Sequence, residues 1–277
     1  MTFIPNISLN DGTTIPQLGL GTYRLEDADA ERVVAEALEL GFRHIDTASL
    51  YKNEVGVGRA IASSGIPRNE LYVTTKCWNS EQTDPRAAIG NSLDRLGLDH
   101  VDLYLIHWPA PARGTYIDAW QEFAKLRVDG LTTSIGVSNF LTEHLDALAA
   151  ASDIVPALNQ IELHPLLQQN ELRAVHAARG IATESWGPLG HGKADLVAEL
   201  PALTNLAERY GKTPQQVVLR WHIQEGTIIF PKTTHRERLV ENMSIFDFEI
   251  SEADMDEIRG FNRDERIGAH PLEGNWD

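Results

Sequence analysis

The chain has 277 residues, of which 42% are hydrophobic and 23% charged, and its formal net charge is −16. This composition is typical of a globular protein, and no apolar run approaches the ~18 residues that span a bilayer, which excludes a membrane-embedded protein. The acidic charge argues against nucleic acid or an anionic membrane as the main partner, because either needs a basic surface. Cys77 is the single cysteine, and the N-terminus lacks the basic start and apolar stretch of a secretory signal. We therefore expect a reducing, cytoplasmic location.

Residues 7–15 predict a short hairpin, because Asp11-Gly12 supplies the positive φ angles that a tight turn between alternating apolar residues needs. Beyond this hairpin, strand-like and helix-like patterns alternate along the chain. The predicted strands are Gln17–Gly21, Arg43–Asp46, Leu71–Lys76, Val101–His107, Thr133–Ser138, Val155–Gln160, Ile181–Glu184 and Thr227–Phe230.

The amphipathic segments between these strands predict helices. Asp84-Pro85 and Thr213-Pro214 each place a capping side chain before a proline at the first helical position, and Gly97 is typical of a helix end. The predicted helices are Asp29–Leu40, Glu54–Ser63, Pro85–Leu96, Tyr116–Val128, Thr142–Ala151, Gln169–Ala178, Pro214–Gln224 and, after the last strand, Arg236–Ser244.

Strands that alternate with helices imply a parallel sheet, and the absence of a linker implies one domain over residues 1–277. We therefore predict an α/β fold of the (β/α)8 TIM-barrel type with an N-terminal β-hairpin. Two segments fall outside the eight units, Lys193–Tyr210 and Ser251–Gly260. We expect them to form extra helical segments that close over a barrel face.

The active site of such a barrel forms at the C-terminal ends of its strands, so polar residues at these ends are candidates for function. Strands two to eight each end in, or close to, a polar or aromatic residue. These residues are Asp46, Lys76, His107, Ser138-Asn139, Gln160, Ser185-Trp186 and Lys232.

Asp46, Tyr51 and Lys76 predict a group that delivers a proton to a carbonyl. A nearby ammonium stabilises a phenolate, so we expect Lys76 to lower the pKa of Tyr51 from its ordinary ~10, with Asp46 holding the lysine in place. His107 is expected to orient the substrate carbonyl. Tyr23, Trp78 and Trp108 are the expected apolar walls of the substrate site.

Each of these residues also has a structural interpretation when taken alone: an ion pair, a cap, or core packing. Their joint placement on one rim favours catalysis. His44 and Asp46 have the spacing of a metal-ligand pair, but the other strand ends carry Lys, Asn and Gln, so we expect no metal. No Gly-x-Ser-x-Gly elbow is present, and Cys77 is expected to pack at the rim.

Neither a Gly-x-Gly-x-x-Gly motif after the first strand nor a Walker loop is present, so a nucleotide would have to be held differently. The basic run after strand eight is the candidate, because Lys232, Thr233 and Arg238 offer charge-assisted donors to a phosphate in an otherwise acidic chain. The alternative is a solvated helix start.

Specific motifs run along nearly the whole chain: Gly41–Tyr51, Asn53–Gly56, Thr74–Lys76, Leu105–Pro109, Ser134–Phe140, Asn159–Pro165 and Ile229–Thr233 with Arg238, Glu241 and Asn242. These motifs resemble those of the aldo-keto reductases, which are monomeric (β/α)8 carbonyl reductases that use NADPH. Within the family the chain looks closest to the prokaryotic branch typified by 2,5-diketo-D-gluconate reductases, judged from residues 185–190 and the tail near Ala269-His270-Pro271.

The resemblance implies a role for each matching residue. Asp46, Tyr51, Lys76 and His107 would be the catalytic tetrad, with Tyr51 as the general acid. The implied cofactor contacts fall into five groups. At the nicotinamide end they are Ser138, Asn139 and Gln160 on the carboxamide and Trp186 on the ring, followed by Leu189 and Gly190 along the pyrophosphate. At the other end they are Lys232, Thr233 and Arg238 on the 2′-phosphate and Glu241 and Asn242 at the adenine.

The expected function is therefore reduction of aldehydes and ketones with NADP(H), and diketo sugar acids are one candidate substrate. The expected oligomeric state is a monomer. A broad-specificity aldehyde detoxifier is the alternative enzyme. A regulatory subunit that binds nicotinamide without useful turnover is the non-enzymatic alternative, against which the intact tetrad argues.

Overall fold

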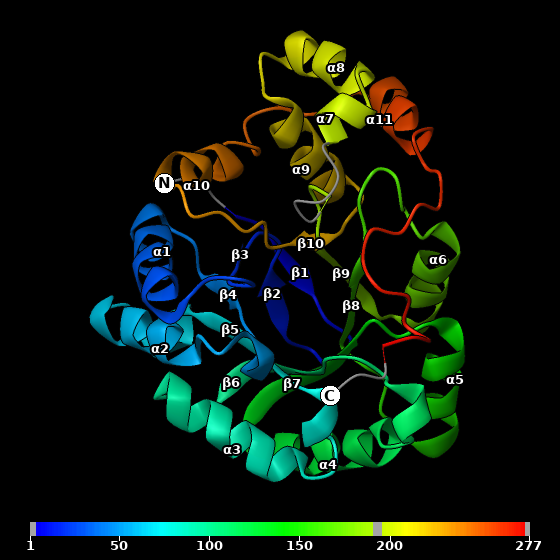
Figure 1. Cartoon of the computed structure of the whole chain (residues 1–277). Coiled ribbons are helices and arrows are strands. Elements are labelled where there is room, and N and C mark those ends of the chain that lie inside the picture. The colour runs from blue at the N-terminus through cyan, green and yellow to red at the C-terminus, as the bar shows by residue number, and fades with distance from the viewer. Residues whose placement is uncertain (1–3, 191–195, 275–277) are drawn as a thin grey trace.

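The computed structural model describes residues 4–190 and 196–274. Its main sheet has eight parallel strands in the order β10-β9-β8-β7-β6-β5-β4-β3 (Figure 1). Their bounds are β3 Leu20–Gly21, β4 His44–Asp46, β5 Tyr72–Cys77, β6 Val101–Ile106, β7 Thr132–Ser138, β8 Leu158–Glu162, β9 Ala182–Trp186 and β10 Ile228–Ile229.

The first and last strands of this sheet meet, which closes it into a barrel. Leu18, just before β3, bridges in parallel to Ile229 of β10. The Gly19 N–H donates to the Ile229 carbonyl at 2.8 Å, and the Ile229 N–H donates to the Gln17 carbonyl at 2.9 Å. The predicted (β/α)8 fold is confirmed.

The N-terminal hairpin closes the amino end of the barrel. Strands β1 (Asn6–Ser8) and β2 (Thr14–Pro16) pair antiparallel around a turn with Gly12 at φ +88°. Leu9 and Ile15 pack inside the barrel against residues at the starts of strands, Tyr72, Leu158 and Ile228 among them. A plugged amino end leaves the carboxyl end for the functional site.

Helices surround the barrel and bury its outer face (Figure 1). Predicted caps form: the Asp84 carboxylate accepts from the Ala87 N–H at 3.1 Å, and the Thr213 hydroxyl accepts from the Gln216 N–H at 3.3 Å. The helices are α1 Asp27–Leu40, α2 Glu54–Ser63, α3 Pro85–Leu96, α4 Tyr116–Val128, α5 Thr142–Ala151, α6 Asn170–Arg179, α9 Pro214–Gln224 and α10 Arg236–Met243.

The two extra helical segments are present as α7 (Leu196–Glu199) with α8 (Ala202–Tyr210), and α11 (Glu252–Arg259). Helices α8 and α11 lie side by side, joined by hydrogen bonds from Arg209 and Tyr210 to Asp254 (Figure 1). The start of the first segment, 193–195, lies outside the described residues. Among the helices that the structure describes, none is long and apolar enough to cross a membrane.

Strand β8 begins later than predicted, at Leu158 instead of Val155. Pro156 has no N–H to give to a neighbouring strand, and Val155 is exposed. Strand β9 runs further than predicted, to Trp186, which places the indole on the strand end itself.

Candidate active site

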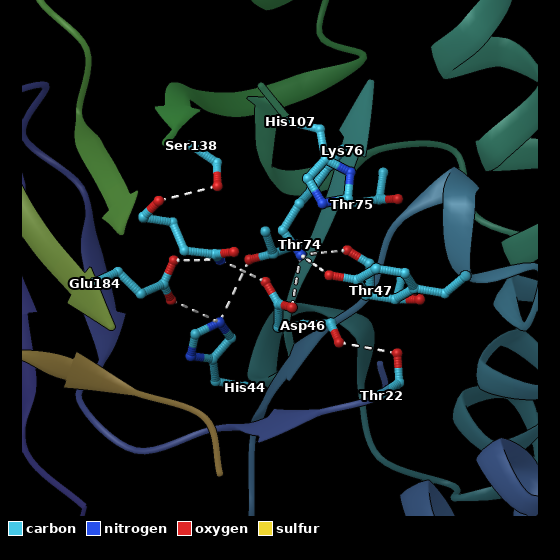
Figure 2. A network of polar contacts seen from close by, with 12 residues as sticks. Thr22, His44, Asp46, Thr47, Thr74, Thr75, Lys76, His107, Ser138 and Glu184 are labelled. Carbon is cyan, nitrogen blue, oxygen red and sulfur yellow. Dashed lines mark hydrogen bonds and ion pairs between the residues drawn. The ribbon is translucent and has the colours of Figure 1, made fainter. Parts of the chain in front are cut away.

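The ends of β4 and β5 bring together a carboxylate and an ammonium that are both fully buried (Figure 2). The Lys76 Nζ donates to Asp46 Oδ1 at 2.7 Å and to the carbonyl oxygen of Thr47 at 2.9 Å. Asp46 Oδ2 accepts from the Gln160 Nε2 at 2.8 Å. A buried ion pair of this kind needs such extra hydrogen bonds to offset the loss of hydration.

Tyr51 reaches the same ammonium from a short 3-10 helix, Ser49–Tyr51, that follows β4. Its hydroxyl lies 3.3 Å from the Lys76 Nζ. The turn is anchored to β5 and the segment after it, because the Ser49 hydroxyl donates to the Glu81 carboxylate at 2.6 Å and lies 3.1 Å from the Lys76 carbonyl oxygen. One ammonium therefore touches both the acid and the phenol.

The pKa of Tyr51 differs from the prediction made from the sequence. Burial raises the pKa of Tyr51 to about 12, and the attraction of Lys76 offsets this only in part. Lys76 lowers the Tyr51 pKa as expected, but the expected net lowering is wrong for this structure, because burial and the Asp46 carboxylate both disfavour a phenolate and together outweigh Lys76. Tyr51 therefore holds its proton at neutral pH, which is the state that a proton donor needs.

Burial and charge act in opposite directions on the ion pair. Burial raises the pKa of Asp46, and Lys76 and Gln160 oppose that rise. Burial disfavours the charged Lys76, but Asp46 and Tyr51 outweigh it and hold the Lys76 pKa above its ordinary value. Lys76 is thus a permanent cation at neutral pH.

His107, which directly follows β6, is the fourth of the predicted catalytic residues. Burial, with a smaller contribution from Lys76, lowers its pKa well below the ordinary value, so the imidazole is neutral. Its ring packs edge-on against Tyr51, with centroids 5.7 Å apart, and against Trp78, with centroids 5.1 Å apart. A neutral imidazole beside the phenol can donate a hydrogen bond to a carbonyl oxygen. The structure brings all four predicted catalytic residues together.

The ends of β7, β8 and β9 form an adjoining polar cluster. The Ser138 hydroxyl donates to the Gln160 carbonyl at 2.9 Å, and the Asn139 Nδ2 donates to the His107 carbonyl at 3.0 Å. The Trp186 Nε1 donates to Asn139 Oδ1 at 2.8 Å, which fixes the indole beside these amides. This cluster joins a stacking surface to amide groups, so the residues fit the nicotinamide end of a dinucleotide.

The predicted phosphate-binding residues lie after β10 and on α10. Lys232 and Arg238 are exposed, and within the described residues neither has an ion-pair partner, whereas Arg236 pairs with Glu39 at 3.0 Å. Thr233 is buried, and its hydroxyl accepts from the His235 N–H at 3.1 Å. Two unpaired cations beside a hydroxyl fit a phosphate group.

The remaining predicted cofactor residues lie on α10 and after β9. The Glu241 carboxylate accepts from the Thr213 hydroxyl, and Asn242 is buried on the same helix. Leu189 is partly buried after β9, and Gly190 follows with φ +84°. Of the predicted apolar walls, Tyr23 packs against Tyr51 with ring centroids 5.0 Å apart, and Trp78 packs against His107. Trp78 and Trp108 are largely buried, and Tyr23 is 37% exposed.

A model of the aldo/keto reductase family matches residues 17–263 of the chain. The chain belongs to this family. An aldo-keto reductase of Mycolicibacterium smegmatis is 52% identical over 98% of both chains, and the methylglyoxal reductase DkgA of Yersinia pestis is 46% identical, also over 98% of both. A mutant of Gox0644, solved in complex with NADPH, is 43% identical with a TM-score of 0.93 over 98% of both chains. The predicted family is confirmed.

Glu162 has a role in this aldo/keto reductase that the sequence did not indicate. Its carboxylate accepts from the N–H groups of Ile267 and Gly268, at 2.6 Å and 3.0 Å, and pairs with Arg266 at 3.2 Å. The buried carboxylate thereby holds the C-terminal tail against the end of β8. Glu162 lies two residues beyond the predicted strand end at Gln160, on the same face of an extended strand, and this placement was the available signal.

Gly268 lies directly against the Trp186 indole, so we expect Gly268→Ala to disturb the tail and the indole together. A Cβ at this position would meet Trp186 Cη2 at 2.4 Å and Glu162 Oε2 at 2.8 Å. Overpacking of this kind costs about 1–3 kcal/mol. We expect a lower melting temperature and weaker NADPH binding by fluorescence titration.

Gly90→Ala in α3 is the matched control, because nothing lies within 4 Å of its added Cβ. Alanine is the better helix former, so this variant should melt at or above the wild-type temperature with unchanged NADPH affinity. Equal melting temperatures and equal NADPH affinities of the two variants would contradict the close approach of the tail to Trp186.

Proposed function

We propose that this aldo/keto reductase reduces aldehydes and ketones to alcohols with NADPH, and that Tyr51 is the general acid. The observation that carries the proposal is the single buried ammonium of Lys76, which contacts the Asp46 carboxylate at 2.7 Å and the Tyr51 hydroxyl at 3.3 Å. An NADPH-bound neighbour and a methylglyoxal reductase among the relatives support the cofactor and the reaction class.

Each residue of the set has a separate task in this reaction. NADPH, when bound, would supply a hydride to the carbonyl carbon. His107 orients the carbonyl oxygen, and Tyr51 donates its proton to that oxygen as negative charge develops there. Lys76 then stabilises the phenolate that remains, and Asp46 keeps the ammonium in place. Hydride and proton together convert the carbonyl to an alcohol.

Ser138, Asn139 and Gln160 are proposed to bind the carboxamide, Trp186 to stack on the nicotinamide, and Leu189 and Gly190 to line the pyrophosphate. Lys232, Thr233 and Arg238 are proposed for the 2′-phosphate, with Glu241 and Asn242 at the adenine. The polar cluster at the ends of β7 to β9 and the two unpaired cations near α10 support this assignment.

NADPH absorbance followed with a panel of carbonyls tests the reaction and the substrate class. Methylglyoxal and simple aldehydes represent the aldehyde detoxifier, and 2,5-diketo-D-gluconate represents the sugar-acid reductase. Absence of turnover with every member, together with tight NADPH binding, would favour the regulatory subunit instead. We keep the monomeric state and cytoplasmic location as predictions.

We expect Lys232→Gly to weaken NADPH binding by roughly 10-fold or more and NADH binding by less than about 2-fold, because a charge-assisted hydrogen bond to the 2′-phosphate is lost only with NADPH. Fluorescence titration with both nucleotides measures the two losses. Arg236→Ala is the matched control, since its guanidinium already pairs with Glu39. Equal losses for both nucleotides in Lys232→Gly would mean that Lys232 does not bind the 2′-phosphate.

A further inference from the structure

Glu184 of β9 lies inside the barrel, one layer below the proposed active site, and takes no part in the reaction proposed above. Side chains two residues apart on a strand share a face, so Glu184 lies under Trp186 as His44 lies under Asp46. Both Glu184 and His44 are completely buried. A carboxyl group in such a position needs a partner, because an isolated buried charge is costly.

Gln160 connects Glu184 to the proposed catalytic carboxylate of Asp46. The Gln160 Nε2 donates to Asp46 Oδ2 at 2.8 Å and to Glu184 Oε2 at 2.9 Å. A primary amide has two N–H groups, and both are used here. Two carboxyl oxygens around one atom require that atom to be nitrogen, so the amide orientation of Gln160 is fixed by this pair.

With both N–H groups of Gln160 used, the amide oxygen Oε1 is the part of this side chain that can face a ligand. No hydrogen bond within the described residues uses Gln160 Oε1, so this oxygen remains available as an acceptor. The carboxamide of nicotinamide carries an NH2 group that needs an acceptor. An amide held with its nitrogen toward the barrel floor can therefore present its oxygen to that group.

The second oxygen of Glu184 faces His44. Glu184 Oε1 lies 3.7 Å from His44 Nε2 and has no hydrogen-bond partner among the described residues. His44 Nδ1 lies 3.3 Å from the Pro16 carbonyl oxygen, which can only accept, so Nδ1 carries the ring proton and Nε2 presents a lone pair. The Thr74 hydroxyl also lies 3.4 Å from this nitrogen. A carboxylate facing the lone pair would be repelled, whereas a carboxylic acid can turn its proton toward it.

We propose that Glu184 is a positioning residue that stays a neutral carboxylic acid, with its proton toward His44 Nε2, and fixes the Gln160 amide so that Gln160 Oε1 receives the nicotinamide carboxamide. This inference rests on the proposed contact between Gln160 and the cofactor. Asp46 remains the anionic partner of Lys76 beneath Tyr51.

The charges around Glu184 agree with a neutral acid. Burial and the nearby Asp46 raise the pKa of Glu184 to about 8, although Gln160 and Lys76 oppose the rise, and burial lowers the pKa of His44 to about 3. The titratable groups that face it are His44 and Asp46 from β4, and Tyr72 and Lys76 from β5. Burial raises the pKa of the Tyr72 hydroxyl well above its ordinary value, so Tyr72 is neutral as well.

Two substitutions of Glu184 test whether its side chain is a neutral acid or an ionised carboxylate. In Glu184→Gln the new amide can accept from Gln160 with its oxygen and direct its NH2 toward His44, as the acid directs its proton. Glu184→Met fills the space but removes the hydrogen bond with Gln160 and the polar group that faces His44. We expect the Gln variant to bind NADPH within about 2-fold of wild type and the Met variant about 10-fold more weakly, the loss that one hydrogen bond gives.

Adenosine 2′,5′-bisphosphate is the control ligand, because it lacks the nicotinamide. Both variants should bind it as the wild type does, by the same fluorescence titration. NADPH binding as weak in Glu184→Gln as in Glu184→Met would show that an ionised carboxylate is needed, and unchanged binding in both would show that Glu184 does not position Gln160. Failure of the wild type to bind NADPH would instead contradict the proposed function.

The protein without nucleotide gives a second test. Between pH 5 and 8 the folded chain keeps the Glu184 proton that the unfolded chain releases, so this group makes wild-type stability fall as the pH rises. Glu184→Gln lacks this effect, so its melting temperature should rise relative to wild type from pH 5 to pH 8. A constant difference over that range would overturn the neutral acid, and this comparison needs no destabilised variant.

Discussion

Tyr51→Phe should abolish carbonyl reduction while leaving NADPH binding largely intact. The substitution removes the proposed proton donor and leaves the ring between Tyr23 and His107 in place. General acid catalysis contributes about 10²–10⁴-fold, so we expect kcat to fall by at least about 10²-fold. NADPH absorbance with methylglyoxal measures turnover, and fluorescence titration measures binding.

Tyr23→Phe is the control for this experiment. The Tyr23 ring lies 5.0 Å from that of Tyr51, but Lys76 contacts the Tyr51 hydroxyl. Removal of the Tyr23 hydroxyl should change kcat by less than about 5-fold, since no step of the proposed reaction uses it. Comparable turnover by Tyr51→Phe and the wild type would contradict the assignment of Tyr51 as the acid.

Lys76→Met should destroy activity and also destabilise the fold. It leaves the Asp46 carboxylate buried without its ammonium, which costs about 3–5 kcal/mol when a buried pair is broken. Because burial already raises the pKa of Asp46, the unpaired carboxyl can take up a proton at low pH. The stability loss, measured by urea unfolding, should therefore be smaller at pH 5 than at pH 8.

The double variant Asp46→Asn with Lys76→Met separates the two effects. It removes both charges, so most of the lost stability should return, while reduction should remain absent because the phenolate of Tyr51 is no longer stabilised. A Lys76→Met protein as stable as the wild type at pH 8 would show that Asp46 and Lys76 are not an ion pair.

Much of the fold was predictable because local patterns and tertiary structure agree. Asp84-Pro85 and Thr213-Pro214 begin helices as their capping chemistry requires, and the predicted strands all occur. The errors lie at strand ends: Pro156 delays β8, since a proline cannot donate to the ladder. Such boundaries depend on which neighbour pairs with the strand, which local sequence does not specify.

The catalytic candidates were predictable for a related reason. Once Asp46, Lys76 and His107 are placed at the ends of parallel strands, barrel geometry brings them to one rim. Glu162 and Glu184 were not found, because each lies within a strand and its partner is far away in sequence. Glu162 holds the tail at Arg266–Gly268, and Glu184 contacts Gln160 on a different strand.

The sequence by itself determined the barrel and the residue types at its rim, because alternating patterns and strand ends are local properties of the chain. Only the tertiary structure decided their protonation. Lys76 next to Tyr51 predicts a lowered pKa when the two are considered as a pair, yet burial raises the Tyr51 pKa to about 12. The cost of burying a charge depends on everything that excludes water around it, and that surrounding is assembled from segments far apart in the chain.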